Sequence, residues 1–251
     1  MNKQIKKDTV NIDEMIIYED EDYVVLNKPS GMLSIPDRFN KDLTNLYALL
    51  KAKYGQIYTI HRLDKDTSGV ICFGKNAEAH RDLNIKFDRG EVYKTYIALV
   101  NGKLENKSGT INLPIAPSKN KKGTMVIDKR YGKSAITNYI VLNEYRNYSL
   151  LEIHPQTGRT HQIRIHLAGI GYPLAIDPIY NKDGKPIFLS MLKKDYKKHD
   201  EKDEKPIMSR LTLHAKKIEF FHFRKRENVC YEAKFHNDFK LLIKYLEKYG
   251  A

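Results

Sequence analysis

The sequence predicts an α+β fold in which a mixed or antiparallel sheet carries most of the core. Strand-like runs outnumber helical runs along the 251 residues, and the two do not alternate regularly as they do in a doubly wound parallel sheet. The composition, with 41 % hydrophobic and 30 % charged residues, is typical of a globular protein and excludes wholesale disorder. The length accommodates one large domain or two small ones.

The N-terminal part is expected to begin with two strands. Met15 to Tyr18 and Tyr23 to Asn27 are apolar runs on either side of an acidic turn, and Lys28-Pro29-Ser30-Gly31 then breaks the chain. Leu43 to Tyr54 carries apolar residues at helical spacing. Residues 1–14 are polar and lack periodicity, so we expect them to be a loosely ordered lead-in to a single domain spanning 15–251.

The next elements are predicted as strand, helix and strand. Gly69 to Gly74 is an apolar run bounded by glycines, which indicates a buried strand. Asn76 to Asp88 has a helical pattern that ends at Gly90. Val92 to Val100 alternates and is rich in Tyr, Ile and Val, as strands are. Residues 101–123 are rich in Lys, Gly and Asn, so we expect hairpins and loops there.

The C-terminal half continues with strands at 134–142, 149–154 and 211–223. A helix is expected over 160–168 with Thr160 as its N-cap, and an amphipathic helix over 237–249.

Between these elements, 181–208 is a polar, lysine-rich insertion. Its simplest interpretation is a solvated surface excursion, and the alternative is an RNA-contacting loop.

Charge and cysteine content narrow the function classes. Lys plus Arg exceeds Asp plus Glu by 44 to 31, a net charge of +13 that favours a polyanionic partner, first of all nucleic acid. The two cysteines, Cys72 and Cys230, form no Cys-x-x-Cys pair, which argues against zinc ribbons and disulfide frameworks. No apolar run approaches membrane-span length, and no apolar core follows the N-terminal lysines, so we expect a cytoplasmic protein without a signal peptide.

Chemistry-bearing residues concentrate in the segment 61–69, His-Arg-Leu-Asp-Lys-Asp-Thr-Ser-Gly. It resembles the start of a calcium loop, but position twelve of that loop is Lys75, which would repel the ion. An Asp-x-Asp phosphotransferase would need Thr at position 68, and the Thr lies at 67. A third chemical interpretation is a lone Asp64 acting as nucleophile or base beside cations, and a simple capped turn is the structural alternative.

A second polar cluster spans 157–167. If this segment is helical, His161 and Arg164 share a face, three residues apart. A metal site is disfavoured because His161 and His166 are five residues apart with no Glu between them and no cysteine near.

These segments, in order, resemble the RluA-type pseudouridine synthase family. The resemblance covers nearly the whole chain. It includes 17–31, His61-Arg62-Leu63-Asp64 with Thr67-Ser68-Gly69, Lys94-Thr95-Tyr96, and the run 157–180 with Asp177-Pro178-Ile179-Tyr180. It ends with Arg210-Leu211-Thr212-Leu213-His214-Ala215.

The resemblance implies a bisected, mostly antiparallel mixed sheet with flanking helices and a central catalytic cleft. It implies an isomerase that cleaves the N1–C1′ bond of a uridine in RNA, rotates the base and rejoins it through C5. The family needs no cofactor, and the implied site has no metal. Asp64 either attacks C1′ or assists a glycal route, and the sequence does not choose between them.

The resemblance also assigns roles to individual residues. Asp64 would be the catalytic carboxylate, Arg164 its ion-pair partner, and Tyr96 the ring that stacks on the flipped base. The implied RNA-binding side chains are Arg62, His61, Lys94, Arg159 and His161. Of these, His61 could equally be structural, and Leu63, Ile163 and Ile165 are expected to pack in the core.

The family-like sequence starts at about Met15, which leaves no room for the extra N-terminal RNA-binding domain of many relatives. Smaller relatives act on large-subunit rRNA, tRNA or both, so the RNA partner is expected among these, and the protein is expected to be a monomer. Two other functions stay open at this point. One is an RNA-binding protein without catalysis, and the other is a magnesium-dependent phosphatase built on Asp64 and Asp66.

Overall fold

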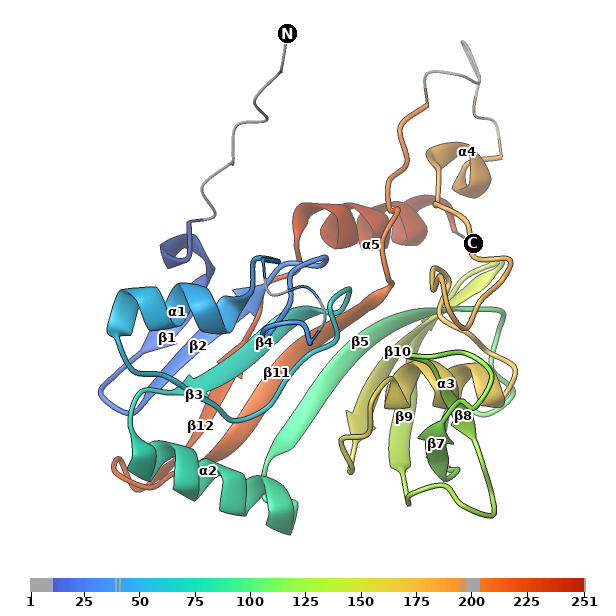
Figure 1. Ribbon diagram of the computed structural model, residues 1–251. Coiled ribbons are helices and arrows are strands. Elements are labelled where there is room, and N and C mark those ends of the chain that lie inside the picture. The colour runs from blue at the N-terminus through green and yellow to red at the C-terminus, as the bar shows by residue number, and fades with distance from the viewer. Residues whose placement is uncertain (1–10, 39, 41, 195, 197–203, 251) are drawn as a thin grey trace, which may run out of the picture.

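The computed structural model describes residues 11–38, 40, 42–194, 196 and 204–250. In these ranges, one ten-stranded sheet has the order β1-β2-β4-β11-β5-β10-β9-β6, with β3 added to β4 and β12 to β11, and β7 and β8 form a separate pair (Figure 1). The strands are β1 (Ile16–Glu19), β2 (Tyr23–Lys28), β3 (Tyr58–Thr59), β4 (Ser68–Gly74), β5 (Tyr93–Asn101), β6 (Ser108–Asn112), β7 (Ile115–Pro117), β8 (Met125–Ile127), β9 (Ile136–Glu144), β10 (Tyr148–Pro155), β11 (Leu213–His222) and β12 (Glu227–Glu232). The helices are α1 (Leu46–Tyr54), α2 (Ala77–Arg89), α3 (Gln162–Gly169), α4 (Leu189–Leu192) and α5 (Asn237–Tyr249), with a 3-10 turn at Asp13–Met15.

The sheet is bisected at the contact between β4 and β11. All strand pairings in it are antiparallel except this one, which is parallel and joins only His214 to Ser68 and Ala215 to Gly69. Beyond these pairs β11 leaves β4 and pairs with β12 instead. The mixed, mostly antiparallel α+β fold is therefore confirmed, with β1 to β4 in one half and β5, β9 and β10 in the other (Figure 1).

Gly69 permits the two halves to approach at this contact. Its φ is +115°, and a Cβ built there would lie 2.1 Å from the carbonyl oxygen of Ala215. Both the backbone conformation and the space therefore require glycine.

A buried polar network closes the same contact. Ser68 and His214 are fully buried, and the Ser68 hydroxyl lies 2.9 Å from Nδ1 of His214. Arg210 donates to Ser68 Oγ at 3.0 Å and makes two hydrogen bonds to Asp238 at the start of α5. Burial lowers the pKa of His214 to about 3, so its ring is neutral. The Arg210–Ala215 segment thus fixes the junction of the half-sheets.

Alternate residues of β5 face opposite layers, as the two-residue period of a strand requires. Ile97 and Leu99 pack in one cluster with α5, whereas Ala98 and Val100 pack in another with α3. In Figure 1, α3 lies in front of the β9–β10 half, and α1 and α2 lie over the other half. The residue pairs between α3 and both β9 and β10 agree with this placement. The second half of the sheet is therefore covered on both faces.

Several sequence predictions need correction. The helix after residue 160 is capped not by Thr160 but by His161, which has a left-handed backbone with φ 55° and makes no side-chain cap. Strand β12 was not predicted, because its residues are mostly exposed and polar.

The insertion 181–208 is not wholly a surface excursion. At its two ends Ile187 and Met208 form a β-bridge and are buried beside Leu192 and α5. The middle of the insertion and most of the 1–14 lead-in, residues 1–10, lie outside the described residues. In the described part of the chain, no helix has the length and apolarity needed to cross a membrane.

Candidate active site

Asp64 lies on the loop that joins β3 to β4, and the segment after β2 holds this loop in place. Ser34 Oγ both donates to the carbonyl of Leu63 and accepts its N–H, at 2.8 and 3.1 Å. The Ser30 hydroxyl donates to the carbonyl of Asp66 at 2.6 Å. These contacts give a physical reason for the Lys-Pro-Ser-Gly break in the sequence, since it forms the support of the loop.

Lys28 is the most buried support. Its side chain is fully buried, and Nζ donates to the carbonyls of Pro29, Met32 and Lys65 at 2.7 to 3.0 Å. Burial lowers the pKa of Lys28 to about 7, although the charges of Asp66 and Asp64 oppose this shift. The lysine therefore holds the Asp64 loop in place by donating to the carbonyl of Lys65, the residue after Asp64.

A cavity of about 650 Å³ opens beside this loop. Its lining comes from the β3–β4 loop, the C-terminal end of α2, the start of β5, the end of β10 and the segment 156–164. The structure brings all eight sequence-predicted site residues to it, namely His61, Arg62, Asp64, Lys94, Tyr96, Arg159, His161 and Arg164.

Arg164 faces Asp64 but makes its closest contacts elsewhere. Its Nη1 lies 3.7 Å from Asp64 Oδ2, whereas Nε and Nη2 donate to the two oxygens of Asp177 at 2.8 and 2.7 Å. Burial opposes the charge of Arg164, but the hydrogen bonds and charge of Asp177, with the charge of Asp64, raise its pKa. Sequence reasoning paired Arg164 with Asp64 alone and assigned no role to Asp177, which is fully buried.

His161 also faces Asp64. Its Nε2 lies 3.9 Å from Asp64 Oδ2, and its Nδ1 lies 2.8 Å from the hydroxyl of Tyr180. Burial is the largest cause that lowers the pKa of His161. Its left-handed backbone is a strained conformation for a non-glycine residue and is of the kind found at functional sites.

Tyr96 on β5 also lines the cavity. Burial, followed by the nearby charge of Asp64, raises the pKa of its phenol well above the ordinary value. The hydroxyl therefore stays protonated and can donate a hydrogen bond, while the ring offers a flat surface. Lys94 lies two residues before Tyr96 on the same strand. Its Nζ lies over the ring of Phe87, and burial lowers the pKa of this amine.

The rim of the cavity is cationic and links the two halves of the sheet. Arg62, which is exposed, donates to the hydroxyl of Thr160 at 3.2 Å across the cavity. Arg159 donates from Nε to the carbonyl of Ser134 at 3.1 Å, which leaves its other nitrogens available. This arrangement suits contacts with phosphates.

His61 has the contacts of a structural histidine. Its Nε2 accepts the backbone N–H of Cys72 at 3.0 Å, and its ring lies against Phe87. Burial lowers the pKa of His61 to about 3, with a smaller contribution from the charge of Lys94. A neutral ring that accepts from the backbone can still offer its Nδ1 to the cavity.

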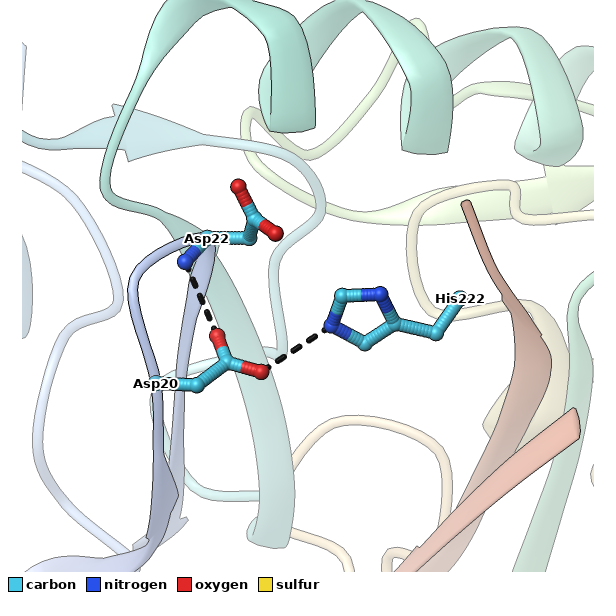
Figure 2. A group of neighbouring side chains, drawn as sticks. All are labelled: Asp20, Asp22 and His222. Carbon is cyan, nitrogen blue, oxygen red and sulfur yellow. Dashed lines mark hydrogen bonds and ion pairs between the residues drawn. The ribbon is translucent and has the colours of Figure 1, made fainter. Parts of the chain in front are cut away.

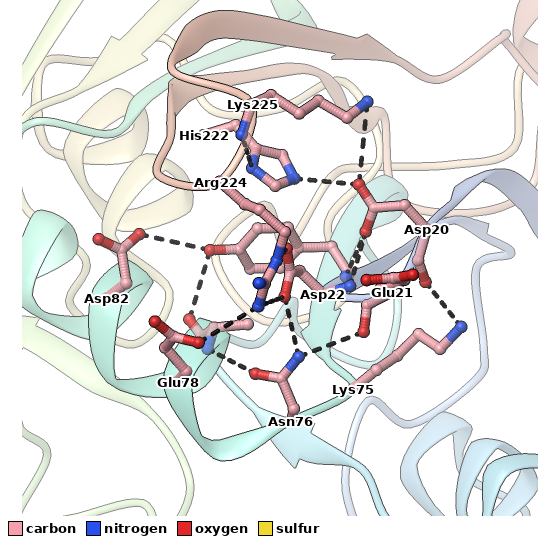
Figure 3. Close-up of polar contacts among 12 residues, drawn as sticks. Asp20, Glu21, Asp22, Lys75, Asn76, Glu78, Asp82, His222, Arg224 and Lys225 are labelled. Carbon is pink, nitrogen blue, oxygen red and sulfur yellow. Dashed lines mark hydrogen bonds and ion pairs between the residues drawn. The ribbon is translucent and has the colours of Figure 1, made fainter.

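A separate acidic cluster lies at the β1–β2 turn, the start of α2 and the β11–β12 turn. Asp20, Asp22 and His222 come close enough together to resemble a metal site (Figure 2). Their oxygens are already bound, because Asp20 accepts from two backbone N–H groups and His222, and Asp22 accepts twice from Arg224 (Figure 3). The hydrogen bonds of this cluster join the three segments to one another.

Comparison with known proteins decides the family. Residues 22–169 match the RNA pseudouridylate synthase family. The chain belongs to this family. It is 33 % identical to the ribosomal large subunit pseudouridine synthase C of Buchnera aphidicola subsp. Baizongia pistaciae, over 98 % of this chain and 75 % of the relative.

Other relatives agree with this assignment. The chain is 33 % identical to the ribosomal large subunit pseudouridine synthase D of Zymomonas mobilis, over 92 % of this chain and 72 % of the relative. The solved structure of human RNA pseudouridylate synthase domain containing 4 has a TM-score of 0.71 at 25 % identity and covers 94 % of each chain. The chain is thus an RNA pseudouridine synthase, an isomerase that converts uridine to pseudouridine in RNA.

Proposed function

We propose that Asp64 is the catalytic carboxylate of this isomerase. The observation that carries the proposal is its position in the cavity, half-buried and faced by Arg164 and His161 at 3.7 and 3.9 Å. Arg164 places a fixed positive charge beside this carboxylate. Such a group can attack C1′ of the ribose, or assist its deprotonation on a glycal route.

The reaction balances within the substrate. The N1–C1′ bond breaks, the uracil turns, and a bond forms between C5 and C1′. The proton on C5 is then lost and a proton is gained at N1, so the product is an isomer of the uridine. The uracil is both the leaving group and the returning nucleophile, so Asp64 needs no external group donor.

The other cavity residues support this chemistry. The ring of Tyr96 is a partner for a base that has left its stack, and its protonated hydroxyl can donate to that base. Arg62 and Arg159 at the rim carry charge suited to the phosphates on either side of the flipped uridine.

We infer that the substrate is large-subunit rRNA, tRNA or both. The relatives named for the ribosomal large subunit support rRNA, and the net charge of +13 supports a large polyanion. Uridines in loops are favoured, because they cost least to unstack. A monomeric state and a cytoplasmic location stay predictions from the sequence.

The test is Asp64→Asn beside Asp66→Asn, a carboxylate on the same loop. Asp64→Asn should abolish conversion of uridine in a single-turnover assay while the dissociation constant for RNA stays nearly unchanged. Asp66→Asn should keep conversion near the wild-type rate. Conversion by Asp64→Asn at the wild-type rate would refute the proposed role. Inactive wild-type and Asp64→Asn proteins that bind RNA equally would favour an RNA-binding role without catalysis.

A further inference from the structure

The turn from Asp177 to Tyr180 touches both residues that face Asp64. Asp177 is fully buried, and its two oxygens accept from Nε and Nη2 of Arg164. Its Oδ1 also accepts the backbone N–H groups of Ile179 and Tyr180, at 2.8 and 3.1 Å. Both oxygens of Asp177 therefore already accept hydrogen bonds, and these bonds fix the orientation of the carboxylate.

This pairing fixes which nitrogen of Arg164 remains for the cavity. The planar guanidinium presents one edge, Nε and Nη2, to Asp177 in a two-bond fork. Nη1 is left facing Asp64 at 3.7 Å, too far for a direct hydrogen bond. Asp64 therefore has a nearby positive charge while its oxygens remain available for a substrate.

Tyr180 acts on the second neighbour of Asp64. Its hydroxyl accepts the backbone N–H of Met125 at 2.9 Å and lies 2.8 Å from Nδ1 of His161, so its own proton can be donated to that nitrogen. A neutral His161 that accepts at Nδ1 carries its proton on Nε2, the atom that faces Asp64. The Tyr180 ring also lies beneath the guanidinium of Arg164, 5.2 Å from its centre.

We propose that the Asp177–Tyr180 turn is a positioning element, which holds Arg164 back from Asp64 and sets the tautomer of His161. The proposal rests on the proposed role of Asp64. Arg164 already faces the carboxylate of Asp64. If Asp177 were removed, Arg164 could form a two-bond ion pair with Asp64 instead, and this pair would occupy the oxygens that the reaction uses. Asp177 therefore contributes by keeping that pair apart.

The change Asp177→Asn tests this arrangement, because it keeps the shape and removes the charge. The single-turnover rate at saturating enzyme should fall about 10- to 100-fold, because Arg164 and Asp64 lose their fixed arrangement, while the dissociation constant for RNA stays the same.

The matched control is Asp238→Asn, which removes an equivalent two-bond partner from Arg210 at the sheet junction. It should leave the single-turnover rate per folded molecule unchanged. The dissociation constant for RNA should be the same in all three proteins. A rate loss in Asp177→Asn that Asp238→Asn shares, or that comes with weaker RNA binding, would indicate a merely structural role and overturn the inference, as would a wild-type rate.

Tyr180→Phe provides a second test that does not depend on the folding of Asp177→Asn. It removes one hydroxyl, keeps the ring beneath Arg164 and frees Nδ1 of His161. The single-turnover rate should fall severalfold with unchanged RNA affinity, and an unchanged rate would overturn the role of Tyr180 in the proposal. A wild-type protein that makes no pseudouridine contradicts the proposed function itself. An active wild type with unaffected variants contradicts this inference alone.

Discussion

Lys28 allows the support of the catalytic loop to be tested by stability rather than activity. The change Lys28→Met keeps the length of the side chain and removes three hydrogen bonds to the carbonyls of Pro29, Met32 and Lys65. At about 1 kcal/mol net for each bond, and with the neutral amine donating only two bonds, the free energy of unfolding should fall by roughly 2 to 3 kcal/mol near pH 7.

The pH dependence gives the sharper test. The pKa of Lys28 is about 7 in the folded protein, and its ordinary value of 10.5 applies to the unfolded chain. Between these two pH values the unfolded chain therefore binds more protons than the folded protein. Wild-type stability therefore gains as pH rises through this window, by about 1.4 kcal/mol per pH unit at most. Lys28→Met lacks this gain. The difference in unfolding free energy between the two proteins should widen by roughly 2 kcal/mol from pH 7.5 to 9.5.

Urea unfolding at a series of pH values measures this difference, and all other titrating groups cancel in it. The control is Lys107→Met, since the Lys107 side chain is 66 % exposed, and its difference from wild type should stay flat. A difference for Lys28→Met that does not change between pH 7.5 and 9.5 would show that the buried amine stays charged, and would refute the reasoning.

Three further outcomes are expected. Gly69→Ala should lower the free energy of unfolding by about 3 kcal/mol or more, because the added Cβ meets Ala215 at 2.1 Å, while Gly55→Ala, with open space around it, should cost only about 1 to 2 kcal/mol. Equal urea midpoints for the two variants would contradict this account of the junction. Arg62→Ala should weaken RNA binding and reduce the slope of log affinity against log salt by about 1; an unchanged slope would remove Arg62 from the phosphate contacts. EDTA should leave turnover unchanged on a correctly folded RNA, because the uracil is its own leaving group and nucleophile, and loss of turnover restored by Mg²⁺ would contradict the proposed chemistry.

Local pattern was sufficient to predict most of the fold. The strand at 92–100 and the helix at 237–249 agree closely with β5 and α5, because periodicity records which faces are buried. Strand β12 was missed because only Tyr231 in it is buried, so it carries little hydrophobic signal. Its existence depends on β11 turning away from β4, which is a property of the whole sheet.

The residues of the cavity were predicted from motifs, but their pairing was not. Asp64, Tyr96 and Arg164 were named together through a family resemblance, and the structure places all three at one cavity. The buried hydrogen bonds from Arg164 to Asp177 were not foreseen. The two residues are thirteen positions apart, and nothing in the sequence between them indicates which carboxylate the arginine contacts. The cap at His161 was missed for a related reason, as its side chain contacts Tyr180 and Asp64, which are distant in sequence, and makes no local cap hydrogen bond.

The most direct test of the central claim is a map of pseudouridines in total RNA from cells with and without this gene. The account predicts that one or a few discrete sites lose pseudouridine without the gene. It predicts that the wild-type gene restores them and that a gene carrying Asp64→Asn does not. Restoration of those sites by Asp64→Asn would contradict the claim that this isomerase works through Asp64.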